Sequence, residues 1–470
     1  MDAPRYSPRL RTGVVFGGTG TAGAYQAGVL RALAEAGIKI DVVAGHGVGA
    51  ATALFAAVDG GARLWDERGP WANRRLLAAY RWRPALRAAA LGLLGALVIL
   101  LSPLFIMLFA AGIYALGALT ALLGMTDTSA SLITFYGRTI GILFDPPILP
   151  TIVPRAVVLA LLVVFGVVGG AAVRAVRSER TRRRMRGAFW WRLIGAPLQA
   201  TEPAAVLGEA LWRHVRGASS DPQPAGAELG ERYVELLTDN FGQPGFHEVL
   251  VAVHDVDARR DLVAAVLPDE ARALFTSGAA PEGGREAETL DLSSASMRGV
   301  LPDVLTAALR LPVATAAHPV GLPADSYWRG NRHVLCDRPE LGVRLIDELA
   351  GIGVEQVILV SAAPSPAGPH ALRRPPGTLR GRIGALVRSI ETAALDDAWR
   401  AALARLEAVF VIRPDHNPIG PFDFAGVYDE GADRERPATE LLLMGYEDAY
   451  RQLVEPIAEA LDADDTEPQP

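Results

Sequence analysis

The sequence predicts an α/β fold, a sheet flanked by helices, into which a helical transmembrane segment is inserted. A strand at 13–16 runs into the glycine turn GGTGTAG and then into the helical pattern AYQAGVLRALAEAG. A second β-branched run at 40–43 ends in another glycine-rich turn, GHGVG. Two uncharged apolar runs, Ala88–Met125 and Ala156–Val173, then separate this beginning from the rest of the chain.

The amino-acid composition argues against some classes of function and excludes some kinds of site. The chain has 470 residues, half of them hydrophobic, and a formal net charge of −6. We therefore expect no nucleic-acid partner, because no basic domain stands apart to neutralise phosphates. The single cysteine, Cys336, excludes an internal disulfide and a CxxC metal site. We expect neither a metal nor another cofactor.

The uncharged runs predict a multi-pass protein of the cell membrane. Arginines precede the first run and follow the second, so the positive-inside rule places both outer flanks, and the globular domain, on the cytoplasmic face. Two crossings are the simplest solution, with the long first run tilted or kinked at Pro103. A hairpin at Pro103 with a further crossing near 132–149 would give four. The basic and aromatic stretch 182–191 fits an anionic membrane surface, or equally a core helix after a stop-transfer flank.

The first glycine turn lies between a strand and a helix, where backbone amides can bind an anion. Two kinds of anion site fit this pattern. One is a dinucleotide site of the short-chain reductase type. Those enzymes need a Tyr-x-x-x-Lys pair, but the only lysine, Lys39, follows Glu35 at that spacing. A nucleotide fold also needs an acid after its second strand, where this chain has the turn at 45–49. The second interpretation, an oxyanion loop, is therefore favoured.

The turn at 45–49 has the spacing of the G-x-S-x-G nucleophile elbow, with Gly47 in place of the serine. Together with the oxyanion loop it resembles the patatin-like phospholipase family. Further motifs carry the same resemblance: TAALRLPVATAAHPV at 306–320, YWRGN at 327–331, Asp337-Arg338-Pro339 and VEQVILVSAAP at 354–364. The resemblance covers residues 12–70 and 230–460.

The resemblance implies a serine–aspartate dyad, and both of its positions are substituted here. Gly47 replaces the nucleophile. The acid position falls on Arg329 when Tyr327-Trp328 is aligned, or on Asn331 when Asp337 and Pro339 are aligned with the family's Asn-x-Pro. Neither side chain is a base near neutral pH. In the oxyanion loop, Thr19 and Ala22 also depart from the family pattern.

The same resemblance gives roles to the glycines. Gly17, Gly18, Gly20 and Gly23 are expected to bind an anion such as a fatty-acid carboxylate or a phospholipid headgroup, and Gly45 and Gly49 to shape the elbow. We therefore expect a lipid-binding or scaffold pseudoenzyme, related to lipid metabolism, with membrane lipids as partners. The alternative is an active acyl hydrolase with an atypical nucleophile.

Other chemistry-bearing residues have simpler interpretations. His46 occupies the variable elbow position and is expected to be packed or solvated. His254-Asp255 is expected to form a turn after a strand, since no third ligand makes a metal site. Cys336 is expected within a strand.

The predicted domain boundaries follow from the motifs. Residues 12–80 form the first part of the α/β domain, 81–186 the transmembrane insertion, 187–230 a connecting segment and 231–460 the second part. Residues 461–470 are expected to be a disordered acidic tail.

Overall fold

The computed structural model describes residues 6–145, 152–178, 195–224, 226–277, 284–366, 368, 376–429 and 433–466. The chain divides into two compact units. Residues Met1–Arg81 and Leu198–Pro470 form one, here called the α/β unit, and Trp82–Pro197 form the other, here called the helical insert.

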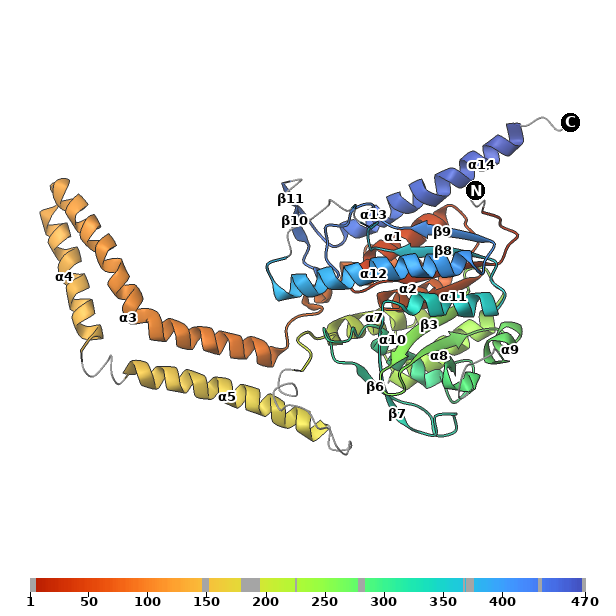
Figure 1. Cartoon of the computed structure of the whole chain (residues 1–470), viewed down its shortest axis with the longest axis horizontal. Coiled ribbons are helices and arrows are strands. Elements are labelled where there is room, and N and C mark those ends of the chain that lie inside the picture. Colours follow the sequence, from red (N-terminus) through yellow and green to blue (C-terminus); the bar gives the residue numbers. More distant parts are fainter. Residues whose placement is uncertain are drawn as a thin grey trace. The chain divides into compact units, whose positions relative to one another are not determined.

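A nine-stranded sheet is the centre of the α/β unit (Figure 1). Seven strands lie in the order β5-β4-β3-β2-β1-β8-β9, and β6 and β7 form a hairpin joined to β3. The pairs β1–β2, β2–β3, β1–β8, β8–β9 and β4–β5 are parallel, while β3–β4 is antiparallel. The strands are β1 (Thr12–Gly17), β2 (Val42–Gly45), β3 (Glu248–Asp255), β4 (Arg260–Val266), β5 (Thr289–Asp291), β6 (His318–Gly321), β7 (Arg332–Cys336), β8 (Gln356–Ser361) and β9 (Ala408–Ile412). The α/β prediction is confirmed.

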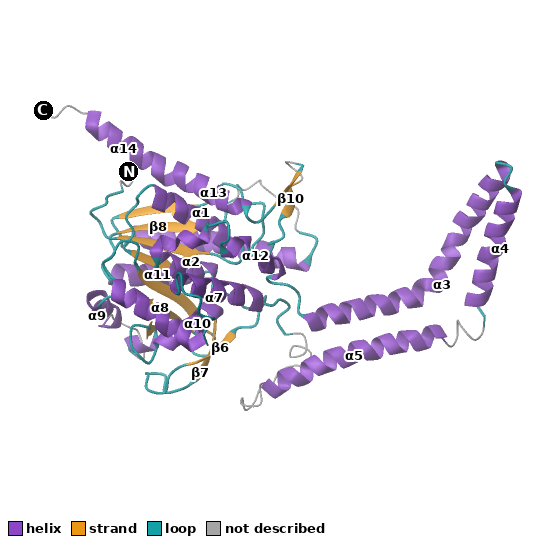
Figure 2. Ribbon diagram, turned by 180° about the vertical axis from the view of Figure 1, so that it is seen from behind, coloured by secondary structure: helices purple, strands orange, loops and turns teal. Residues whose placement is uncertain are grey.

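Helices cover both faces of this sheet, as Figure 2 shows. Strand residues therefore alternate between two apolar cores: Val14 and Phe16 belong to one, and Val15 to the other. The helices are α1 (Ala22–Glu35), α2 (Val48–Ala56), α7 (Thr201–Val215), α8 (Gly226–Asn240), α9 (Asp269–Ser277), α10 (Leu301–Ala308), α11 (Leu341–Gly351), α12 (Leu379–Leu403), α13 (Glu440–Ala449) and α14 (Glu455–Thr466). Short 3-10 turns at Asp59–Leu64, Pro70–Ala72 and Arg74–Ala78 lead from α2 to the insert, and β10 (Val427–Asp429) pairs with β11 (Arg434–Arg436) in a separate hairpin.

The helical insert consists of α3 (Pro84–Leu122), α4 (Thr126–Leu143) and α5 (Val153–Ser178) among the described residues. Two helical stretches, Pro84–Leu122 and Val153–Val173, are long and apolar enough to cross a membrane, and almost none of the residues in their most apolar parts is buried. Core helices of soluble proteins are mostly buried, and these are not. Figure 1 shows α3 bending partway along its length, and Pro103 lies inside it.

Two boundary predictions change, and one prediction cannot be compared. The segment after Pro197 belongs to the α/β unit, because α7 buries Val206 and Leu211 completely in its core. The tail predicted to be disordered from residue 461 is helical up to Thr466, since α14 is rich in good helix formers. The basic stretch 182–191 lies outside the described residues.

Candidate functional site

The predicted elbow has the backbone of a nucleophile elbow. β2 ends at Gly45, α2 begins at Val48, and Gly47 between them has φ 60° and ψ −135°. This combination of backbone dihedral angles is rare. In α/β hydrolases the same kind of sharp turn exposes the nucleophile at the top of the sheet. Gly49 packs against the carbonyl of Phe16 with no room for a Cβ, which explains the flanking glycine. The turn is present, but Gly47 at its nucleophile position has no side chain.

A carbonyl oxygen occupies the place where an oxyanion would be bound. The backbone N–H of the residue after the nucleophile normally forms half of an oxyanion hole. Here that N–H, from Val48, donates to the carbonyl oxygen of Gly18 at 2.8 Å. A Cβ placed on Gly47 would lie well inside 3.0 Å of the same oxygen. The Gly18 peptide therefore presents its acceptor, not its donor, to the elbow.

The rest of the glycine loop is also engaged within the fold. The amide of Thr21 donates to the carbonyl of Pro421 at 3.0 Å, and the amide of Gly23 donates to Gly20 at 3.4 Å. Gly20 packs on that same Pro421 carbonyl and Gly23 on a tryptophan ring, again with no space for a Cβ. Gly17 lies against the ring of His46. These close contacts, rather than an open cradle of amides, account for the glycines here.

An acid does lie beside the elbow, but it is Asp337. Its Oδ2 is 2.9 Å from an ideal Cβ on Gly47, its side chain is buried, and its Oδ1 is 3.2 Å from Nδ1 of His46. The two acid positions expected from the sequence are corrected: Arg329 and Asn331 are exposed residues of the β6–β7 connection. They lie before β7, whereas the residue that reaches Gly47 directly follows that strand.

A second buried carboxyl, Glu391 on α12, was not found from the sequence. Its side chain is only 8% exposed, and its Oε1 has no hydrogen-bond partner in the described part of the chain. Burial raises the pKa of this carboxyl to about 7; the Thr19 hydroxyl lowers it and the charge of Asp337 raises it. Thr19 Oγ1 lies close to the carboxyl yet forms no well-directed hydrogen bond among the described residues. The signal available in the sequence was an acid on the apolar face of α12, in helical register with buried Val387, Ala394 and Ala398.

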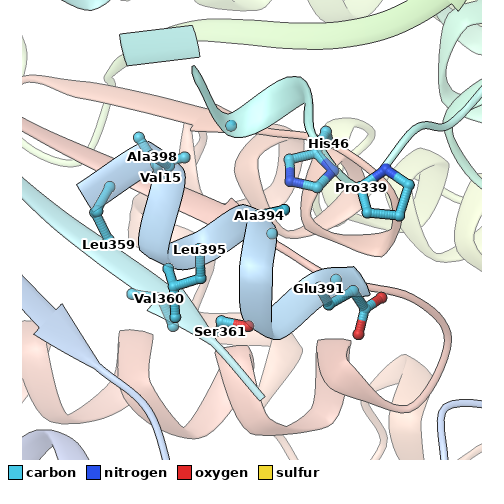
Figure 3. A pocket seen from close by; sticks show the side chains of 13 residues that line it. Val15, His46, Pro339, Leu359, Val360, Ser361, Glu391, Ala394, Leu395 and Ala398 are labelled. Atoms are coloured by element: carbon cyan, nitrogen blue, oxygen red, sulfur yellow. The ribbon is translucent and has the colours of Figure 1, made fainter. Parts of the chain in front are cut away.

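His46 and Glu391 border a cavity of about 30 Å³ under α12. Figure 3 shows His46, Pro339 and Glu391 at one end, and aliphatic side chains such as Val15 and Leu359 at the other. This volume is large enough for one water molecule and is well below the roughly 150 Å³ of a cavity that binds benzene. The cavity therefore has no room for an acyl chain.

A larger hollow of about 150 Å³ lies beside the glycine loop. Its walls are mainly apolar and come from the start of α1, the turns before the insert and the segment around 424 and 437–439. They include Ala24, Trp71, Leu77, Phe424 and Ala438. The Trp71 ring packs directly on Gly23, so the hollow adjoins the loop that faces the elbow. Its size and lining suit a short apolar segment of a ligand.

Histidine–aspartate pairs also occur away from the elbow. Nδ1 of His333 is 2.6 Å from Asp255, which is fully buried and accepts the amides of Asp257 and Ala258. His254 and Asp255 are thus the last residues of β3, and the turn that was predicted there lies at 256–259. Cys336 is a buried strand residue, as predicted, and burial raises the pKa of its thiol to about 12. Across the described residues, no group of three or more His, Cys, Asp or Glu side chains is placed to hold a metal.

Part of the chain resembles a known family. Residues 14–105 match the family model described as Patatin-like phospholipase, which confirms the predicted resemblance. Over these residues the chain is thus similar to that family. No curated protein matches it. Among solved structures, the crystal structure of VipD from Legionella pneumophila aligns over 97% of this chain and 67% of its own, with 12% identity and a TM-score of 0.30.

Proposed function

We propose that this protein is a membrane-anchored, non-hydrolytic relative of the patatin-like phospholipases, which binds lipid without cutting it. The observation that carries the proposal is the elbow itself. Gly47 supplies no nucleophile, and the Val48 amide that would stabilise an oxyanion already binds the Gly18 carbonyl. In subtilisin, loss of the nucleophile alone costs about 10⁶ in kcat. Loss of both groups removes the two main contributions to ester cleavage.

The charge at the elbow changes the ligand expected from the sequence. The carboxyl of Asp337, the carbonyl of Gly18 and, at higher pH, the carboxylate of Glu391 all disfavour a fatty-acid carboxylate at this point. The apolar hollow beside Trp71 is a better place for lipid. We propose that it receives part of an acyl chain, while the headgroup stays outside.

Membrane anchoring is supported by the exposed apolar surfaces of α3 and of Val153–Val173. An apolar area of this size needs a hydrocarbon environment or a partner to cover it. In the proposed arrangement both helices cross the bilayer, and the α/β unit lies on the cytoplasmic face, as the arginine flanks require.

The experiment uses the full chain in nanodiscs containing a diazirine-bearing phosphatidylethanolamine. Photolysis should crosslink lipid to the turns around Trp71, with no release of fatty acid. Replacing Ala438, a half-buried wall residue, with Phe fills the hollow and should reduce that crosslink. Ala385→Phe on an exposed face of α12 is the matched control. An unchanged crosslink in Ala438→Phe would overturn the lipid site.

One observation favours a second candidate, an acyl hydrolase with an atypical nucleophile. The Thr19 hydroxyl lies beside Glu391, whose pKa of about 7 suits a general base at neutral pH. Such an enzyme would release fatty acid and lose this activity in both Thr19→Val and Glu391→Gln. We rank it second because the adjoining cavity is too small for an acyl ester.

A further inference from the structure

Val313 occupies a strained turn that holds an apolar side chain in water. Its φ is +69°, which is an outlier for a β-branched residue, and its side chain is 87% exposed. The Ala314 amide donates to the carbonyl of Pro312 at 2.8 Å, which closes a three-residue γ-turn. The Thr315 amide donates to Leu311 at 2.8 Å and supports the turn. Strain of this kind, with an exposed valine at its tip, indicates a contact outside the chain.

The chain passes between the α/β unit and the insert beside this turn. The amide of Leu198 donates to the carbonyl of Ala314 at 2.9 Å, and the amide of Gln199 donates to the carbonyl of Arg81 at 3.0 Å. Both connections therefore lie next to Val313. From Arg81 to Ala88, where the uncharged run begins, the chain spans at most about 25 Å. If α3 enters a bilayer, as the proposed function requires, this face of the α/β unit lies close to the lipid surface.

The segment that leads from the α/β unit towards the insert carries both apolar and basic groups. Leu77 is 46% exposed, and its carbonyl accepts the Nε–H of Arg81 at 3.3 Å. Arg380 is half-buried at the start of α12, and burial lowers the pKa of its guanidinium. The charges of Asp423, which raises this pKa, and of Arg81, which lowers it, both act on the group. Cations of this kind are stabilised by anionic headgroups.

The segment just before Val313 is hydrogen-bonded to residues near the elbow. The carbonyl of Arg310 accepts the amide of Asp337 at 2.7 Å, and the hydroxyl of Tyr80 donates to the carbonyl of Leu309 at 3.1 Å. Val313 is thus three residues from Arg310, whose carbonyl binds the amide of Asp337, the acid beside the elbow.

We propose that Leu77, Arg81, Val313 and Arg380 form a docking surface for an anionic lipid bilayer. Val313 and Leu77 enter the headgroup region, and the two arginines face lipid phosphates. The occupant is the bilayer that receives α3. Charge complementarity and the short link from Arg81 to Ala88 favour it over a protein partner.

The test measures contact with lipid in the intact protein. Val313→Cys is labelled with an environment-sensitive fluorophore, and the full chain is reconstituted in nanodiscs of phosphatidylethanolamine and phosphatidylglycerol. Entry of the label into the headgroup region should shift its emission to the blue, and nitroxide groups attached to lipid headgroups should quench it. Leu274→Cys on α9, where the leucine is 52% exposed, is the control, because Figure 1 shows α9 at the edge of the unit remote from the start of α7. The native Cys336 is buried and stays unlabelled.

Two further arms separate this proposal from membrane anchoring itself. A label at Leu100→Cys within α3 should be quenched by nitroxides placed deep in the acyl chains. Val313 unquenched while Leu100 is quenched overturns the docking surface and leaves the anchoring intact; neither label quenched overturns both. In nanodiscs of phosphatidylcholine alone, quenching at Val313 should fall, because the arginines lose their anionic partners. Equal quenching in both lipids overturns the electrostatic part.

Discussion

The amide of Val48 and the carbonyl of Gly18 are joined by a 2.8 Å hydrogen bond across the elbow. In an active hydrolase that amide is free to receive the oxygen of the tetrahedral intermediate. The loss of function here thus lies in the backbone of the glycine loop as well as in the missing hydroxyl. A single substitution at Gly47 cannot reverse both changes, although Asp337 is already in place as an acid.

We predict that Gly47→Ser leaves the protein without esterase activity. The new Cβ would collide with the Gly18 carbonyl, and the Val48 amide would still be occupied. The strain should lower the free energy of unfolding by about 1–3 kcal/mol. Fluorophosphonate labelling and fatty-acid release measure the activity, and urea denaturation measures the stability.

Gly47→Ala is the matched control, since it adds the same Cβ without a hydroxyl. Equal destabilisation of the two variants assigns the effect to the steric contact. Strong fluorophosphonate labelling of the serine variant would show instead that the Gly18 peptide moves aside readily. Labelling of the unsubstituted protein that disappears in Thr19→Val would replace the non-hydrolytic proposal with the second candidate function.

The pair between His46 and Asp337 is expected to stabilise the elbow. Both side chains are buried, at 6% and 2% exposure, so removing one partner leaves the other without its hydrogen bond. Asp337→Ala should lower the free energy of unfolding by about 1–3 kcal/mol, because it leaves the buried imidazole of His46 without its hydrogen-bond partner. Asp397→Ala, which breaks a pair with Arg400 on the surface of α12, should cost less than about 1 kcal/mol. Similar midpoints of urea denaturation for the two variants would refute a structural role for the buried pair.

How far the sequence predicts this site depends on which elements carry it. The strand, turn and helix around Gly47 are local, so their spacing alone predicts the elbow, and the apolar runs predict α3 and α5 in the same way. The acid position depends on the length of the β6–β7 connection, which no local pattern specifies. For that reason motif alignment selects Arg329 or Asn331, whereas the fold brings Asp337 to the elbow. Glu391 is distant in sequence, and only the packing of α12 brings it to the site.

Glu391 should make stability depend on pH. Burial raises its pKa from 4.5 to about 7, so between these values the folded protein binds a proton that the unfolded chain releases. Stability from this group is fully present below pH 4.5 and is lost as pH rises through 7, a change of the order of 3 kcal/mol. Glu391→Gln removes the titration. Its stability relative to the unsubstituted protein should rise with pH across this window, measured by urea denaturation at a series of pH values. A constant difference between the two proteins would contradict a raised pKa.

Membrane orientation can be tested by cysteine labelling in intact cells. Thr128 near the start of α4 and Leu274 on α9 are both exposed and lie in different units. With two crossings, a thiol reagent that does not cross membranes should reach Thr128→Cys from outside and Leu274→Cys only after lysis. Reaction of both from outside, or of neither, would exclude the proposed topology.

The strain at Val313 predicts opposite effects on stability and on lipid contact. Glycine adopts a φ of +69° without the cost that valine incurs, so Val313→Gly should raise the free energy of unfolding by about 1 kcal/mol, even after the entropy that glycine adds to the unfolded chain. Val256→Gly is the control: this valine is also exposed, but its φ is ordinary, so the same change should destabilise by about 1 kcal/mol. In nanodiscs, a fluorophore at Leu77→Cys should be quenched less by headgroup nitroxides once Val313 is glycine, because the docking surface has lost its apolar tip. A more stable protein with weaker lipid contact is the result expected of a residue retained for function. If Val313→Gly is more stable and the quenching at Leu77 is unchanged, the strained turn has another role.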